Sequence, residues 1–271
     1  MAESGRQPGL VGDSRFALGR HAVVTGASRG IGAAIAREIA RAGANVTLIG
    51  RDADALSRQA AMLHGESGVA AHAQPADVTD DAVLRDAFGA AAARYGPIAI
   101  LVNSAGQAEG APFLEIERET WDRILAVNLT AAFIGMQLAL PGMLEAGNGR
   151  IVNVASTAAL RGVPRIAPYV ASKHGLLGLT RSLALEVAKK GVTVNAVCPG
   201  YVDTDMARTA VDAIVSGLKR TAEEARQLIA RPSAFNRLLE PEEVARVVVW
   251  LCSPDAATVT GQAIVIGGDV I

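Results

Sequence analysis

A tyrosine and a lysine, Tyr169 and Lys173, stand four residues apart in a stretch with helical patterning. On an α-helix this spacing places both side chains on one face, a turn apart. A phenol beside an ammonium can exchange a proton with a substrate if its acidity is shifted, because an unperturbed phenol has a pKa of about 10. A lone Tyr-x-x-x-Lys pair is common and usually structural, so this chemistry needs further polar partners.

Two candidate partners precede the pair. Ser156 directly follows a predicted strand at 150–155, and open α/β sheets bind ligands at the carboxyl ends of their strands. Asn128 lies in an uncharged stretch, 124–144, where a buried amide needs hydrogen-bond partners. The candidate catalytic group is therefore Asn128, Ser156, Tyr169 and Lys173.

A glycine-rich turn, Thr25-Gly26-Ala27-Ser28-Arg29-Gly30-Ile31-Gly32, lies between the first predicted strand and the first helix. Glycines let a backbone approach a pyrophosphate closely, and the N-terminus of the following helix favours its negative charge. The spacing is G-x-x-x-G-x-G rather than the commoner G-x-G-x-x-G. Some such turns are merely tight turns, but this turn's place in a strand–helix–strand pattern strengthens the phosphate-binding interpretation.

Strands and helices that would position these residues alternate along the whole chain. We predict strands at 22–24, 46–49, 69–73, 98–103, 150–155, 193–198 and 263–266, and helices at 31–42, 54–63, 80–95, 120–146, 167–190 and 241–252. This alternation predicts an α/β fold, a doubly wound parallel sheet of Rossmann type with helices on both faces.

We expect one domain, at 17–271, after a loose N-terminal extension at 1–16. The segment 204–240 interrupts the strand–helix alternation, and we interpret it as a helical lid over the site, although a helix pair that fills a packing gap is the alternative. Thr221 and Glu224 predict a capping box there. Apolar residues with helical spacing in the same segment are Val211, Ile214, Val215 and Leu218.

Composition excludes several classes of protein. The 271 residues include 26 Lys and Arg against 27 Asp and Glu, so no overall charge favours nucleic acid or an anionic membrane. Cys198 and Cys252 lie in apolar stretches and are expected to be buried, reduced thiols, which suits a cytoplasmic protein. The uncharged stretch is long enough for a membrane span, but its polar residues and Pro141 favour a buried helix. No spacing indicates a metal site.

Taken together, these motifs resemble the short-chain dehydrogenase/reductase family. They follow the family order from near residue 21 to the C-terminus, with Ser104 as a small departure where asparagine is commoner. The motifs that carry the resemblance are the glycine-rich turn, Asp77-Val78, Asn103-Ser104-Ala105-Gly106, Asn128, Ser156, Tyr169, Lys173 and Pro199-Gly200.

The resemblance implies a role for each member of the catalytic group. Tyr169 would protonate the alkoxide left by hydride delivery, with its pKa lowered by Lys173 and the nicotinamide ring. Lys173 would also hold the nicotinamide ribose. Ser156 would donate a hydrogen bond to the carbonyl oxygen, and Asn128 would hold a water that relays protons past Lys173.

The resemblance also implies a nicotinamide cofactor. Asp77 would bind the adenine amino group with Val78 beside the ring, Asn103 would steady the central strand near the ribose, and Val202 and Thr204 would contact the carboxamide and phosphates. The full set expected to bind the cofactor is Gly26, Ser28, Arg29, Gly30, Ile31, Gly32, Arg51, Asp77, Val78, Asn103, Ala105, Gly106, Tyr169, Lys173, Pro199, Gly200, Val202 and Thr204.

The end of the second predicted strand bears on which nicotinamide binds. An acidic residue there would bind the ribose 2′-hydroxyl of NADH, but the sequence has Gly50 followed by Arg51. With Arg29 in the glycine-rich turn, two guanidinium groups would flank the ribose and favour the 2′-phosphate of NADPH. NADH remains possible, because Asp52 could serve it if its side chain turned inward.

Within the family, the stretches 154–173 and 194–206 and the long lid look most like reductases of 3-oxoacyl thioesters. The substrate would then be carried by an acyl carrier protein or CoA, whose phosphates could meet Arg161, Arg165 or Arg208, although surface solvation is the commoner fate of such side chains. The alternatives are a dehydrogenase of a cyclic or secondary alcohol, such as a steroid, sugar or terpenoid, and a catalytically inactive NADP-binding regulator.

The helices at about 121–146 and 169–190 also predict a homotetramer. The first is apolar on more than one face, and a helix apolar all round must be buried on a second side. In the resembling family these two helices form an interface between subunits. A second interface would use 264–266 with the apolar Val270-Ile271 end, and two distinct two-fold interfaces generate a tetramer.

Overall fold

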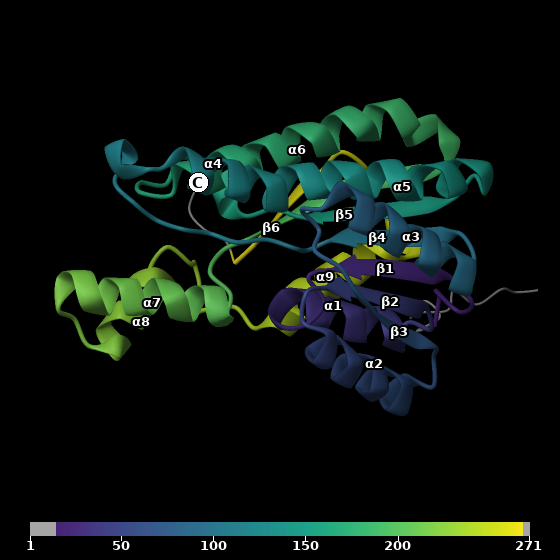
Figure 1. Cartoon of the computed structure of the whole chain (residues 1–271), viewed down its shortest axis with the longest axis horizontal. Helices are drawn as coiled ribbons and strands as arrows, with labels where there is room; N and C mark the ends of the chain where they lie inside the picture. Colours follow the sequence, from purple (N-terminus) through teal and green to yellow (C-terminus); the bar gives the residue numbers. More distant parts are fainter. Residues whose placement is uncertain (1–14, 268–271) are drawn as a thin grey trace, which may run out of the picture.

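A seven-stranded parallel sheet forms the centre of the protein, in a computed structural model that describes residues 15–267. The strand order is β3-β2-β1-β4-β5-β6-β7, and every neighbouring pair is parallel (Figure 1). The strands are β1 His21–Thr25, β2 Asn45–Gly50, β3 Ala71–Pro75, β4 Ile98–Asn103, β5 Gly149–Val154, β6 Val192–Pro199 and β7 Ala263–Ile266. This confirms the predicted doubly wound fold of Rossmann type.

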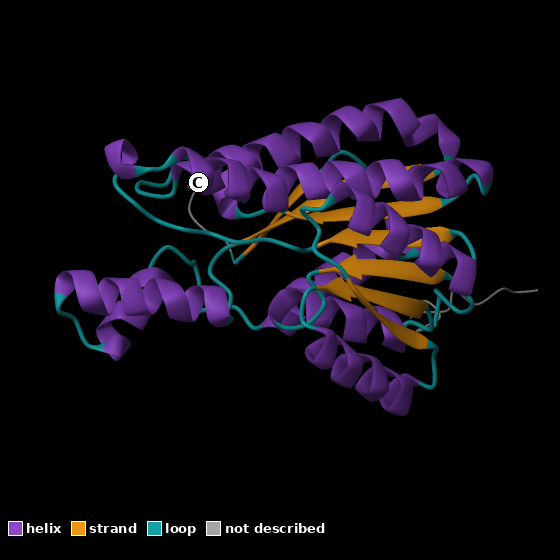
Figure 2. Cartoon of the chain, in the orientation of Figure 1, coloured by secondary structure: helices purple, strands orange, loops and turns teal. Residues whose placement is uncertain are grey.

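Helices cover both faces of the sheet (Figure 2). Helices α1, α2 and α9 pack on one face and α3, α4, α5 and α6 on the other, with a hydrophobic core on each side. The helices are α1 Gly30–Arg41, α2 Ala53–Ser67, α3 Asp81–Tyr95, α4 Arg118–Leu125, α5 Ala131–Glu145, α6 Ala167–Val187, α7 Asp205–Leu218, α8 Ala222–Ala230 and α9 Pro241–Cys252. Both cores are mainly aliphatic, because the chain contains only 4% aromatic residues.

The sheet changes direction between β1 and β4. From β1 the chain runs outward through β2 and β3, then returns to place β4 on the other side of β1. In open α/β sheets the crevice outside the carboxyl ends of the strands at this point is where ligands bind. The topology therefore places the candidate site beyond the ends of β1 and β4.

The predicted helix at 120–146 contains a departure from α-helical geometry. Between α4 and α5, residues Ala126–Thr130 form a π-helical segment that widens one turn of an otherwise continuous helix. Such segments are rare and frequently lie at functional sites. Asn128 is in the middle of this segment and is buried.

Several strand and helix boundaries also differ from the prediction by a few residues, most of all the end of α2. Helix α2 continues to Ser67 and ends at Gly68 in the left-handed conformation (φ +69°), which glycine adopts without strain. Strand β3 consequently begins at Ala71, two residues later than predicted. The predicted last helix and last strand, α9 and β7, have the observed bounds.

The stretch Arg118–Glu145 is 28 residues long, and its most apolar window has a mean hydropathy of 1.7, which suffices for a membrane span. In the structure 44% of that window is buried, with α5 packed against β4 and α3. The helix therefore packs on the core with one face and has a second apolar face at the surface.

Helices α7 and α8 project beyond the carboxyl ends of the strands (Figure 1). They have a small hydrophobic cluster of their own, separate from the two cores: Ala207, Ile229, Ala230 and Leu238. Thr221 and Glu224 form the predicted capping box at the start of α8, and this expectation is confirmed. Helices α7 and α8 therefore pack on each other through this cluster.

Candidate active site

The glycine-rich turn is joined to the loop after β4 by one threonine. Thr25 ends β1 directly beside Asn103, the end of β4. Its Oγ1 accepts hydrogen bonds from the backbone N–H groups of Ser104 (3.1 Å) and Ala105 (3.2 Å). The two loops that follow the central strands are thereby held side by side, as a cofactor site at this edge requires.

Glycine is required where these two loops meet. Gly26 has a φ of +68°, and a Cβ there would lie 2.8 Å from the backbone of Ala105. A Cβ on Gly32 would lie 2.2 Å from the carbonyl oxygen of Gly26. Arg29, the N-cap of α1, makes no side-chain capping hydrogen bond, so the first N–H groups of the helix remain available to an anion. These features fit the pyrophosphate of a dinucleotide.

Ser156 and Tyr169 come together although they lie on different elements. Ser156 follows β5 and its Oγ accepts a hydrogen bond from the N–H of Ala158 (3.1 Å). The same hydroxyl is hydrogen-bonded to the phenol of Tyr169 in the first turn of α6. Burial raises the pKa of Tyr169 above its ordinary value, and the hydrogen bond to Ser156 opposes this effect.

Lys173 lies one turn further along α6 and is buried. Its Nζ donates a hydrogen bond to the carbonyl of Val154 (2.8 Å) and lies 5.6 Å from the centre of the Tyr169 ring. Burial lowers the pKa of Lys173 to about 8. Without a cofactor, burial has the largest effect on the pKa of Tyr169, and the expectation that Lys173 and the nicotinamide ring of a bound cofactor lower this pKa stays a prediction.

Asn128 is held tightly by the loop after β4 and by α6. Its Oδ1 accepts from the N–H of Gln107 (2.9 Å), and its Nδ2 donates to the carbonyl of Gln107 (3.0 Å) and to Ser172 Oγ (3.0 Å). A Cβ added to Gly106 would lie 3.4 Å from Asn128 Oδ1 and 3.6 Å from Lys173 Nζ. The amide oxygen and the ammonium therefore face the same small space at Gly106.

Sequence reasoning missed several residues that support this group. Ser172 links Asn128 to α6, because its hydroxyl also donates to the carbonyl of Tyr169 (2.8 Å). Asn103 Nδ2 donates to Asn153 Oδ1 (2.8 Å), and Asn153 Nδ2 donates to Thr180 Oγ1 (2.9 Å). The sequence signal that could have found them is the presence of polar residues within the otherwise apolar segments 149–154 and 167–187.

The two cysteines are buried, as the sequence predicts, and both are free. Burial raises the pKa of Cys198 to about 11 and that of Cys252 to about 12. These shifts disfavour a nucleophilic thiolate near neutral pH at either position.

At the expected adenosine end, Asp77 and Val78 follow β3. Asp77 Oδ1 accepts from the N–H (2.9 Å) and hydroxyl (2.8 Å) of Thr79, and these bonds, with a smaller effect from Arg51, lower its pKa. Asp52 does not turn inward, because its side chain caps α2 by accepting from the N–H of Ala55 (2.9 Å). The carboxylate that could have served NADH is thus committed to the helix.

Gly50, at the end of β2, has room for a Cβ. A Cβ there would make only ordinary contacts, 3.6 Å from a Leu56 methyl group and 3.9 Å from Ser28 Oγ. Arg51, the next residue, is exposed. Glycine at this position is therefore not required by packing, and its effect is to keep a side chain and its charge away from the site.

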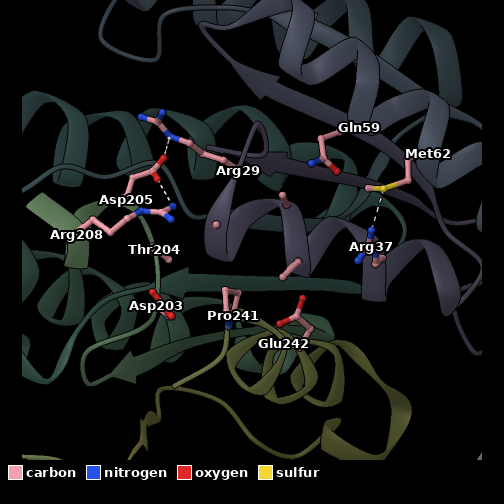
Figure 3. Close-up of a pocket in the computed structure, with 13 residues that line it drawn as sticks. Arg29, Arg37, Gln59, Met62, Asp203, Thr204, Asp205, Arg208, Pro241 and Glu242 are labelled. Atoms are coloured by element: carbon pink, nitrogen blue, oxygen red, sulfur yellow. Dashed lines mark hydrogen bonds and ion pairs between the residues drawn. The ribbon is translucent and has the colours of Figure 1, made fainter. Parts of the chain in front are cut away.

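The side chain of Arg29 reaches α7. Its Nε forms an ion pair with Asp205 (3.2 Å) at the rim of a pocket of about 300 Å³ between α1, α7 and α9 (Figure 3). Arg208 also binds Asp205. Two other arginines were candidates to contact substrate phosphates. Arg165 is exposed, has a φ of +72°, and its carbonyl accepts a hydrogen bond from the N–H of Ala111 (2.8 Å). Arg161 is half-buried.

The segment after β6 closes the far side of the site. Gly200 N–H donates to the carbonyl of Ile266 (2.9 Å), which fixes the turn after Pro199 against β7. Val202 is buried and bridges to Leu239, and the Thr204 methyl group lies 3.2 Å from where a Cβ of Gly30 would be. The loop before α7 thus lies directly against the glycine-rich turn.

Metal chemistry finds no support in the described part of the chain. Among residues 15–267, no group of three or more His, Cys, Asp or Glu side chains could hold a metal ion.

Comparison with known proteins identifies the family. The family model described as short chain dehydrogenase matches residues 20–214. The chain belongs to the short-chain dehydrogenase family. It is an oxidoreductase, and its strand order and the arrangement of Ser156, Tyr169 and Lys173 agree with the membership inferred from the sequence.

Similar members of this family include reductases and dehydrogenases. A protein of Streptomyces violaceoruber assigned as ketoacyl reductase 1 of the granaticin polyketide synthase is 43% identical over 249 residues, 91% of each chain. D-beta-hydroxybutyrate dehydrogenase of Rhizobium meliloti is 39% identical, over 91% of this chain and 96% of its own. A crystal structure of an actinorhodin polyketide ketoreductase variant with NADPH has a TM-score of 0.88 at 40% identity, covering 92% of this chain and 96% of the other.

Proposed function

We propose that this short-chain dehydrogenase is a cytoplasmic, NADPH-dependent ketoreductase that converts a 3-oxoacyl thioester to the secondary alcohol. The observation that carries the proposal is the group of Ser156, Tyr169 and Lys173 at the carboxyl ends of the strands, in which Tyr169 is hydrogen-bonded to Ser156 and Lys173 is buried. Relatives named as ketoacyl reductases support the choice of ketone reduction.

The cofactor, when bound, supplies the hydride. Tyr169 donates the proton that the resulting alkoxide requires, and its raised pKa keeps the phenol protonated across neutral pH. The hydroxyl of Ser156, oriented by the N–H of Ala158, donates a hydrogen bond to the carbonyl oxygen of the substrate. Lys173 holds the nicotinamide ribose, and Asn128 orders a water at Gly106 that returns a proton toward Lys173.

The residues around the expected adenosine ribose favour NADPH over NADH. Gly50 presents no carboxylate to repel a 2′-phosphate, and Asp52 is held away as the cap of α2. Arg51 and Arg29 are the cations that would bind the phosphate. The remaining cofactor contacts stay as predicted from the sequence, with Asp77 and Val78 at the adenine and 199–204 at the nicotinamide.

An acyl carrier protein or CoA is the partner that fits a thioester substrate. The acyl chain would lie between the loop 157–166 and the lid formed by α7 and α8, which has its own hydrophobic cluster and so can move to admit a long arm. Arg161 and Arg165 are the candidates to contact phosphates of the carrier near this opening.

The proposal is tested by following NADPH absorbance with purified protein and a panel of ketones. We expect rapid oxidation of NADPH with acetoacetyl-CoA or an N-acetylcysteamine thioester of a 3-oxo acid, and much slower oxidation of NADH. Turnover only with cyclic or other secondary alcohols and their ketones would favour the alternative dehydrogenase. Binding of NADPH without turnover of any substrate would favour an inactive regulator.

We also propose that the protein assembles as a homotetramer. Helices α5 and α6, with the π-helical segment before α5, line an apolar groove of about 450 Å³ on the outer surface, and Phe133 in this groove is 42% exposed. A second copy of the same surface would cover it in a two-fold arrangement. Strand β7, at the sheet edge, would serve the second interface; Val270 and Ile271 lie outside the described residues.

A further inference from the structure

The guanidinium of Arg29 connects the glycine-rich turn to the start of α7. Arg29 is in the glycine-rich turn at the start of α1, where the proposed function places phosphate groups. Its ion-pair partner Asp205 is the first residue of α7, the first helix of the proposed lid. Figure 3 shows the two side chains directed toward each other, with Arg208 on the other side of the carboxylate.

This ion pair contributes little to the stability of the fold. The side chains of Arg29 and Asp205 are 75% and 47% exposed, and exposed pairs contribute little because water screens them. Asp205 also keeps a cationic partner, Arg208, if Arg29 moves away. Arg29 is therefore available to another anion of higher charge.

The pair nevertheless affects where α7 lies. The hydrophobic cluster of α7 and α8 is separate from the two cores. Asp203, in the loop before α7, binds Arg226 of α8, whereas Arg29–Asp205 joins α7 to α1. Releasing Arg29 thus removes an ion pair that joins α7 to the start of α1.

We infer that Asp205 determines cofactor specificity in part, because its carboxylate competes with the 2′-phosphate of NADPH for Arg29. The inference rests on the proposed use of NADPH. A dianionic phosphate accepts two parallel hydrogen bonds from a guanidinium and carries more charge than a carboxylate, so the phosphate displaces Asp205. NADH has no phosphate at this position, and it leaves the Arg29–Asp205 pair intact.

The competition lowers the affinity for NADPH below the value that Arg29 could provide. Asp205→Asn removes the competing charge, keeps the size of the side chain and leaves Arg29 free before the cofactor binds. We expect the Kd for NADPH to fall about two- to fivefold, the range that an exposed ion pair supports, and the Kd for NADH to change less than twofold.

The experiment is a double-mutant cycle on the purified full chain, with the Kd of NADPH and of NADH measured by nicotinamide fluorescence. The variants are Asp205→Asn, Arg29→Gln and the two combined. Asp212→Asn, which removes an exposed carboxylate from the same helix, is the matched control for net charge. We expect Arg29→Gln to weaken NADPH binding. In the double variant, Arg29→Gln should abolish the gain in affinity that Asp205→Asn gives. Asp212→Asn should change neither Kd.

Each other outcome overturns the inference. If Asp205→Asn improves NADPH and NADH binding equally, or still improves NADPH binding with Arg29→Gln present, Asp205 acts as a general charge and not through Arg29. If the wild type prefers NADPH and Asp205→Asn has no effect, the inference fails while the proposed function stands. If the wild type binds NADH as tightly as NADPH, the proposed cofactor preference fails and the inference with it.

Discussion

At the scale of single residues, the phenol of Tyr169 on α6 is hydrogen-bonded to Ser156 and is the proposed proton donor. Tyr169→Phe keeps the ring and removes the proton, so we expect kcat to fall by a factor of about 10² to 10⁴ while the Kd for NADPH stays within about twofold. Steady-state kinetics and fluorescence titration measure the two effects. Retention of more than about a tenth of the activity would exclude Tyr169 as the acid.

The titration of Lys173 leads to a second prediction at this scale. The burial of Lys173 lowers its pKa to about 8, whereas the burial of Tyr169 raises the phenol's pKa. In the reducing direction the phenol therefore remains protonated near neutral pH, and the first group to lose its proton as pH rises is Lys173. We expect kcat/KM to be level near neutral pH and to fall above about pH 8. A profile that remains level up to pH 10, near the phenol's ordinary pKa, would contradict this assignment.

Gly50 provides the residue-scale test of cofactor preference. A Cβ at Gly50 would make only ordinary contacts, with Leu56 and Ser28 at 3.6 to 3.9 Å. Gly50→Asp adds a charge that repels a 2′-phosphate and can accept from a 2′-hydroxyl, so we expect the kcat/KM ratio to shift toward NADH by about tenfold or more. Gly50→Asn has nearly the same shape without the charge and should shift the ratio far less; equal shifts would show a steric effect.

At the scale of elements, the capping box of Thr221 and Glu224 stabilises the start of α8. Thr221→Ala should cost that helix about 1 kcal/mol. Because α7 and α8 have their own hydrophobic cluster, we expect faster hydrogen exchange in α8 and a raised KM for a long acyl thioester, with little change in Tm. Thr209→Ala is the control, since that hydroxyl donates only to the Asp205 carbonyl within α7. A large drop in Tm would show that the lid is part of the main cooperative unit.

At the scale of the whole molecule, Gly178 allows the assembly to be tested without harming the subunit. Gly178 lines the groove between α5 and α6, and a Cβ there meets nothing within 4 Å. Gly178→Arg should therefore be tolerated by the subunit but should fill the groove and block the interface. By light scattering we expect a tetramer for the wild type and a smaller species for this variant. Gly89→Arg on α3, which also meets open space, is the matched control; a monomeric wild type would contradict the assembly.

The sequence by itself determined the order of strands and helices and the residue types at the candidate site. These features depend on local signals: apolar runs, glycine-rich turns, the capping box of α8 and the spacing of Tyr169 and Lys173. Such signals act over a few residues, so they can be interpreted without knowing what packs against them. The fold followed from them because parallel strands joined by helices allow few arrangements.

Only the tertiary structure decided how charges and hydrogen bonds are shared across the site. The pairing of Arg29 with Asp205 joins residues far apart in the chain, and the commitment of Asp52 to a helix cap depends on the exact start of α2. The raised pKa of Tyr169 depends on burial among β5, β6 and α6. Asn128, in the π-helical turn, likewise contacts Gln107 and Ser172, which are distant in the chain. Burial and long-range contacts are properties of the packed molecule, so no local pattern could specify them.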